Sequence, residues 1–113
     1  MTAKNTLLTA PPYPVEQALK RLGANLRTAR VRRNLTIKDV AEKIGTGPRP
    51  VSDAEKGKPS TSAAVYIALL WAYDLLDQMD DVADPLQDQQ GLALSMGRER
   101  VRAREKKGLD NEF

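Results

Sequence analysis

Apolar residues recur every three or four positions from Val15 onward, which is the spacing of an amphipathic helix. A first helix is predicted over residues 14–34, because Pro14 suits a first helical turn and Asn34 tolerates the left-handed conformation that often ends a helix. One side of this helix is expected to face the core, namely Val15, Leu19, Leu22, Leu26 and Ala29.

Two short helices joined by a glycine-containing turn are predicted next. Thr36 is suited to cap a helix over residues 37–44, and the turn 45–47 leads to a helix over residues 48–56. The small side chain of Ala41 allows these two helices to approach closely. Two short helices connected in this way form a helix-turn-helix.

The remaining apolar positions predict two further helices. Ser60 is expected to cap the fourth, and residues 75–82 predict the fifth, which Asp84 and Pro85 end. The positions of the fourth helix expected in the core are Ala64, Ile67, Ala68, Trp71 and Leu75. Other apolar side chains exceed what one small core can cover and are expected to form a dimer interface, namely Leu70, Tyr73, Leu76 and Met79.

The pattern therefore predicts an all-α protein in three parts. Residues 1–13 are polar with a pair of prolines and are expected to be a flexible arm. Residues 14–83 are expected to form the five-helix domain that carries the helix-turn-helix and the dimer interface. Residues 84–113 form a tail that cannot bury much surface by itself, so we expect it to be partly disordered or to fold against a partner.

Charge is distributed unevenly along the chain. The net charge is only +3, but residues 1–60 carry +7, residues 61–97 carry −6 and residues 98–113 carry +2. A basic first half is expected of a surface that faces nucleic acid. The basic run 98–107 is either a solvated helix or disordered tail, or a surface that binds a partner.

Composition argues against an enzyme. The chain has no Cys, which excludes a thiolate nucleophile, and no His, which removes the commonest metal ligand and the commonest general base. Four carboxylates lie close together in sequence, but no loop spacing of a calcium site surrounds them, namely Asp77, Asp80, Asp81 and Asp84. We expect these to be a solvated acidic surface, and we expect no cofactor and no metal.

No apolar run reaches the length of about 20 residues that spans a bilayer. Residues 1–10 also lack the apolar core of a secretory signal. The sequence therefore predicts a cytoplasmic protein without a membrane partner.

Residues 22–73 resemble the Xre/lambda-repressor-like helix-turn-helix family. The segments that carry the resemblance are LGANLRTARVRRNLTIKDVAEKIG and VSDAEKGK. The resemblance implies a dimer that binds a palindromic operator in double-stranded DNA.

The resemblance also implies a role for individual residues. Four side chains are expected to read bases from the third predicted helix, namely Pro48, Arg49, Ser52 and Asp53. Six residues are expected to hold phosphates, namely Lys38, Lys56, Lys58, Ser60, Thr61 and Ser62. Arg30 and Glu55 are expected to form a buried ion pair that fixes the first helix to the third.

The chain departs from the family pattern at several of these positions. Ile37 stands where many members carry a glutamine that binds phosphate, and Gly47 replaces the usual Ser or Thr cap. Pro48 and Pro50 each lack a backbone N–H donor. Both fall in the first turn of the predicted helix 48–56, where N–H groups are unpaired anyway. Asp53 could accept from a cytosine or repel phosphate, which leaves Arg49 as the strong base reader.

The segments after the helix-turn-helix resemble HipB-type antitoxins, which are Xre-family proteins paired with HipA-like serine/threonine kinase toxins. The segments are ALLWAYDLLDQMDDVADPLQDQQGLAL and the terminal LDNEF. The implied function is an antitoxin that represses its own operon and binds the kinase. Two alternatives are a stand-alone Xre-type repressor and a protein-interaction module whose DNA binding has degenerated.

Overall fold

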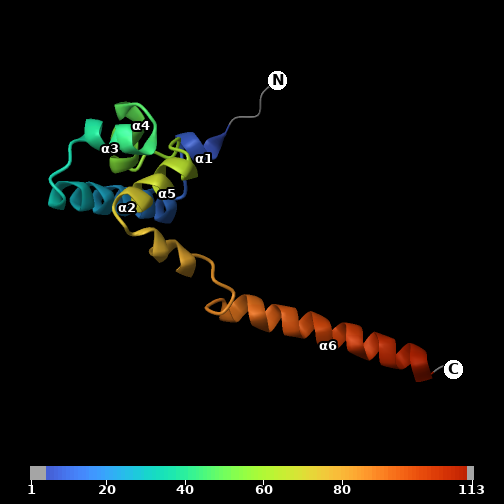
Figure 1. The fold of residues 1–113 in the computed structure, drawn as a ribbon. Helices are drawn as coiled ribbons and strands as arrows, with labels where there is room; N and C mark the ends of the chain where they lie inside the picture. Colours follow the sequence, from blue (N-terminus) through green and yellow to red (C-terminus); the bar gives the residue numbers. More distant parts are fainter. Residues whose placement is uncertain (1–4, 112–113) are drawn as a thin grey trace. The chain divides into compact units, whose positions relative to one another are not determined.

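The computed structural model describes residues 5–111, with side-chain surroundings up to residue 108, and every element in this part of the chain is helical (Figure 1). The prediction of an all-α protein is confirmed. The elements in order are α1 (Thr6–Thr9), α2 (Tyr13–Arg32), α3 (Ile37–Ile44), α4 (Pro48–Glu55), α5 (Ala63–Ala72), the 3-10 helix η1 (Leu76–Asp81) and α6 (Gln89–Asn111).

The chain forms two compact units, Met1–Asp77 and Gln78–Phe113. In the first unit α4 packs against α2, α3 and α5, and α3 also contacts α5. The largest side chains that are almost completely buried there are Leu26, Val40, Val51, Leu69 and Tyr73. Four helices thus share one core, and burial of these apolar side chains is the main source of stability in this unit.

The predicted helix 14–34 corresponds to α2, and Asn34 follows it with a φ of +55°. Leu26 and Ala29 are buried as expected, whereas Val15 is 40% exposed. Part of the segment expected to be a loose arm forms the short helix α1, and residues 1–4 of that arm lie outside the described residues.

Local interactions define both ends of α3. The Thr36 hydroxyl accepts the Asp39 N–H, and the Asp39 carboxylate accepts the Thr36 N–H, both at 3.0 Å. The Thr36 N–H that donates to the carboxylate, followed by the Thr36 hydroxyl beside it, lowers the pKa of Asp39. At the other end Gly45 has a φ of +82°, and Thr46 donates its N–H to the Ala41 carbonyl. This closure directs the chain sharply into α4.

Helix α4 lies very close to α2 because of two glycines. A Cβ atom added to Gly23 of α2 would lie 2.5 Å from the carbonyl oxygen of Ala54, so only glycine fits at this crossing. Gly57 follows α4 with a φ of +69°, and a Cβ atom there would lie 2.6 Å from the backbone of Leu19. Backbone contact at both points fixes the position of α4 on α2.

The predicted orientation of the fourth helix was wrong. Ile67 and Trp71, which were expected in the core, are 39% and 51% exposed. The buried side chains of this region are Tyr66, Leu69, Leu70, Ala72 and Tyr73. Helix α5 is apolar on all sides, so the apolar pattern could not show which side faces the core.

This rotation also changes the expected dimer surface. Leu70 and Tyr73 belong to the core of the first unit and cannot contact a second copy. The large exposed apolar side chains on α5 are Ile67 and Trp71, and Leu76 of the expected set is also exposed. The start of the helix differs too, because Ser62 and not Ser60 caps it, by accepting the Val65 N–H at 3.4 Å.

The segment after α5 differs from the predicted α-helix over residues 75–82. It forms the 3-10 helix η1, and the flanking residues Asp74 and Ala83 both have positive φ, +58° and +56°. In the second unit, the tail expected to be partly disordered contains the 23-residue helix α6. Asp88 directly precedes this helix, and its carboxylate accepts the Gly91 N–H of the first turn at 3.0 Å. No helix in the described residues is both long and apolar enough to span a membrane.

Candidate nucleic-acid interface

An ion pair fixes the inner side of α4. The Arg30 Nε and Nη2 atoms donate to the two carboxylate oxygens of Glu55 at 2.7 and 3.0 Å. The third nitrogen, Nη1, donates to the Leu35 carbonyl at 2.9 Å. Both side chains are largely buried, with exposed fractions of 12% and 6%. The hydrogen bonds to Glu55 raise the pKa of Arg30, so the pair stays charged, and it orients α4 with respect to α2.

A second contact, which the sequence did not predict, connects α2 to the end of α5. Arg33 donates to the Ala29 and Tyr73 carbonyls at 3.0 and 2.8 Å. Its guanidinium group also lies 5.6 Å from the centre of the Tyr73 ring. Burial raises the pKa of Tyr73 to about 12. Arginine is frequent on exposed helix surfaces, so nothing in the spacing distinguished Arg33 from a solvated residue.

The outer side of α4 is open to solvent next to α3. It forms one shallow depression of about 600 Å³, lined by Ile37, Pro48, Arg49, Ser52, Asp53, Lys56 and Lys58. All four residues expected to read bases therefore line the same surface. The opposite side of α4 is completely buried through Val51 and Ala54. Helix α4 thus has one side in the core and one side open to solvent.

The acidic residue of this surface is paired. The Lys58 Nζ atom lies 3.1 Å from the Asp53 carboxylate, and the Lys58 N–H also donates to the Asp53 carbonyl. The positive φ of Gly57 allows the chain to turn back so that Lys58 reaches Asp53. Lys58 therefore cancels much of the negative charge that Asp53 would present to a phosphate, at the cost of its own availability.

The chemistry of the depression matches the edges of base pairs. Arg49 is exposed at the first turn of α4 and can donate two hydrogen bonds to a guanine. Ser52 can donate or accept, and the apolar Ile37 side chain can contact a thymine methyl group. Ile37 thus lacks an amide group that could bind a phosphate and presents an apolar side chain to the depression.

The residues expected to hold phosphates are not equally available. Lys38, Lys56 and Ser60 are exposed, and Ser62 is exposed while it caps α5. Thr61 is different, because its hydroxyl is buried and its N–H donates to the Lys58 carbonyl. The structure therefore presents no polar group of Thr61 to a phosphate. In the part of the chain that the structure describes, no cluster of carboxylates could hold a metal ion.

Comparison with known proteins gives one match. No curated protein and no solved structure matches the chain. The family model of a helix-turn-helix domain matches residues 21–82, which is more than half of the chain. This range contains α3, the turn and α4, together with α5 and η1. The motif is one that binds DNA with its second helix in the major groove. The chain therefore belongs to the helix-turn-helix domain family.

Proposed function

We propose that the protein is a transcriptional repressor that recognises a specific operator through the outer side of α4. The observation that supports this function best is the depression that brings Arg49, Ser52 and Asp53 together beside Ile37. In this role α4 enters the major groove and Arg49, near its N-terminus, reaches the base edges. The protein then acts on DNA in the cytoplasm and carries out no catalysis.

Phosphate contacts would position the protein on the duplex. Lys38 in the first turn of α3 is exposed, and Lys56 at the end of α4 is exposed and lines the depression. Contacts of this kind supply affinity but carry no sequence information directly. Lys58 contributes mainly by neutralising Asp53, so we assign it a different role from that of Lys38.

The first prediction separates base reading from charge attraction. Arg49→Ala should weaken binding to the operator by about ten- to a hundredfold, because a bidentate contact to guanine supplies roughly 1–3 kcal/mol of discrimination. Binding to a random duplex should change much less. Fluorescence anisotropy measures both, with a duplex from the region upstream of the gene as the operator probe.

Lys38→Ala is the matched control, since Lys38 is exposed and lies outside α4. It should weaken binding to both duplexes equally and lower the slope of log affinity against log salt by about one. Equal losses on both duplexes for Arg49→Ala would contradict the base-reading role. Absence of binding to either duplex by the unchanged protein would favour the protein-interaction module instead.

We also propose that the repressor is a homodimer. Ile67 and Trp71 give α5 an exposed apolar side, and apolar surface of this kind often lies in subunit interfaces. A two-fold symmetric dimer would place two copies of α4 about 34–36 Å apart, one turn of DNA. The operator should then be a palindrome.

The antitoxin function is our more specific proposal. It is supported by the resemblance of residues 68–94 and the terminal LDNEF to HipB-type antitoxins, which implies that the partner is a HipA-like serine/threonine kinase toxin. Co-expression with the product of an adjacent kinase-like gene should yield a stable complex. A gene that has no such neighbour, or a kinase that does not co-purify, would favour the stand-alone repressor.

A further inference from the structure

Helix α6 carries a dense basic segment without charged partners. Residues 98–107 contain six Lys or Arg and two Glu, a net charge of +4, and all of their side chains are exposed. The ion pairs found among the described residues are Glu16–Lys20, Arg30–Glu55 and Asp53–Lys58, and none of them involves α6. The positive charge of this helix is therefore not compensated within the described residues.

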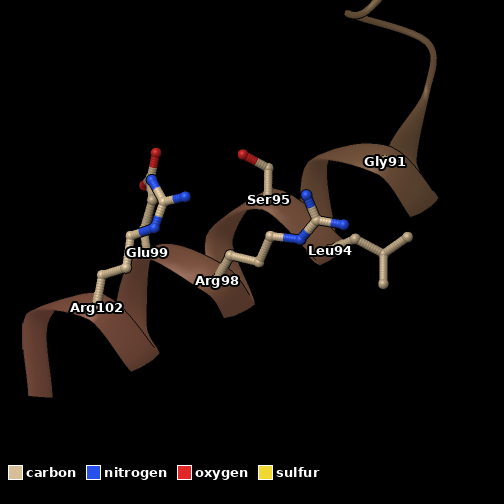
Figure 2. A pocket seen from close by; sticks show the side chains of 6 residues that line it. All are labelled: Gly91, Leu94, Ser95, Arg98, Glu99 and Arg102. Carbon is tan, nitrogen blue, oxygen red and sulfur yellow. The ribbon is translucent and has the colours of Figure 1, made fainter. Parts of the chain in front are cut away.

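The basic side chains form two rows on opposite sides of the helix. Successive residues of an α-helix are rotated by about 100°, so residues four apart share a side and residues two apart do not. Arg98 and Arg102 form one row, and Figure 2 shows Arg98 extending toward Leu94 and Arg102 lying beside Glu99. The other row consists of Arg100, Arg104 and Lys107.

A narrow strip without charge separates the two rows on one side of the helix. Leu94, Gly97 and Val101 lie along this strip at spacings of three and four residues. Because Gly97 has no side chain, the strip is hollowed, and a depression of about 450 Å³ extends over it to Arg98 and Arg102. The helix therefore presents a shallow uncharged floor from Leu94 to Val101 with cations on both sides, and Glu105, four residues after Val101, follows at its end.

We propose that α6 is a second DNA-binding element, which lies in a groove of duplex DNA with one basic row toward each phosphate backbone. The major groove admits an α-helix and has phosphates along both of its edges. The basic segment is about 15 Å long, and DNA carries one negative charge per about 1.7 Å of its axis. This contact adds affinity outside the operator contacts of α4, so it extends the proposed function and rests on it.

The arrangement of apolar residues distinguishes this ligand from a membrane surface or an apolar protein groove. Both of those partners require a helix with one continuous apolar side. In α6 the apolar side chains are divided, since Leu92 and Met96 lie on the other side of the helix from Leu94 and Val101. Cations on two opposite sides suit a ligand that carries negative charge on both sides of the helix.

The test measures how binding of the full chain to a random-sequence duplex depends on salt. The variant Arg98→Gln/Arg102→Gln/Arg104→Gln removes charge from both rows. Each lost phosphate contact lowers the slope of log affinity against log salt by about 0.9, so the slope should fall by about two to three. Replacing the same three residues with lysine should keep the slope of the unchanged protein.

The matched control is Glu99→Gln/Glu105→Gln, which alters the same helix with the opposite change in charge. Binding to the random duplex should become tighter, and circular dichroism should show equal helix content in all variants. An unchanged slope of log affinity against log salt for the triple glutamine variant would overturn the proposal. This result is also expected if the basic rows bind an acidic protein and not DNA. If the slope is unchanged but Arg49→Ala still loses its preference for the operator, only the proposed role of α6 is wrong. If the unchanged protein binds no DNA at all, both the role of α6 and the proposed function are wrong.

Discussion

Tyr73 is completely buried, yet its hydroxyl has no hydrogen-bond partner among the described residues. Leaving a buried polar group unsatisfied costs about 1–3 kcal/mol. Tyr73→Phe removes that group and keeps the ring that packs below Arg33, so the free energy of unfolding should rise by about 1 kcal/mol. Thermal unfolding should then shift upward by roughly 4–8 °C.

Tyr66→Phe is the matched control for this prediction. The Tyr66 hydroxyl donates to the Lys58 carbonyl at 3.4 Å, so its removal should lower the melting temperature or leave it unchanged. A Tyr73→Phe variant that melts below the unchanged protein would mean that its hydroxyl has a partner in solution.

The same residue gives a dependence on pH. Burial raises the pKa of Tyr73 to about 12, against about 10 in an unfolded chain, because the core disfavours the phenolate. A raised pKa means that the stabilisation is complete below pH 10 and is lost as the pH rises toward 12. The stability difference between Tyr73→Phe and the unchanged protein should therefore grow over this interval in urea titrations.

At the scale of residues, one of the two ion pairs next to α4 could be predicted from the sequence and the other could not. The Arg30–Glu55 pair was expected from a family resemblance, and the two side chains lie 2.7 Å apart. The pair between Asp53 and Lys58 was not expected, since it depends on the positive φ of Gly57. Such a turn places two residues together in a way that charge and spacing alone do not reveal.

At the scale of elements, the contact between α2 and α4 determines the position of the depression on the outer side of α4. Glu55→Ala leaves the buried guanidinium of Arg30 without its partner, which should lower the free energy of unfolding by about 3–5 kcal/mol. Chemical denaturation measures this loss. A small domain has only about 5–15 kcal/mol in total, so partial unfolding near physiological temperature is the expected result.

The control is Glu16→Ala, which breaks the exposed pair with Lys20. Surface pairs of this kind contribute at most about 1 kcal/mol, so this variant should unfold almost like the unchanged protein. Similar losses for the two variants would show that the Arg30–Glu55 pair stabilises the contact between α2 and α4 no more than a solvated pair does.

Helix boundaries were predictable where the sequence carries specific end signals. Thr36 and Gly45 define α3, and the predicted range 37–44 agrees with the structure. The orientation of α5 was not predictable, because leucine, isoleucine and tryptophan occur around its whole circumference. Contacts from α3 and α4 decide which side is buried, and a single-sequence pattern contains no information about those contacts.

At the scale of the whole molecule, the exposed side of α5 is where we expect two copies to meet. Trp71→Arg should place a charge in that interface and give a monomeric mass in light scattering at micromolar concentration, where the unchanged protein should be a dimer. Val31→Arg is the control, since Val31 is also exposed but lies on α2. A dimer that persists in Trp71→Arg would move the interface elsewhere.

The tail was the least predictable part of the molecule. Because it can bury little surface by itself, the tail was expected to be partly disordered or to fold against a partner, and in the structure it contains the helix α6 from Gln89 onward. The Asp88 carboxylate at its start and the many good helix formers within it outweigh the three glycines. Its apolar side chains, such as Leu92, remain exposed. The apolar pattern of this segment therefore did not indicate what the helix binds.

The position of Trp71 also gives the molecule an intrinsic optical probe. It is the single tryptophan of the chain, the residue is 51% exposed, and the ammonium group of Lys43 lies 5.6 Å from the ring centre. Indole emission shifts to shorter wavelength when water leaves its surroundings. Dilution of the unlabelled protein should therefore report subunit dissociation as a red shift, whereas DNA bound at α4 should leave the emission maximum unchanged.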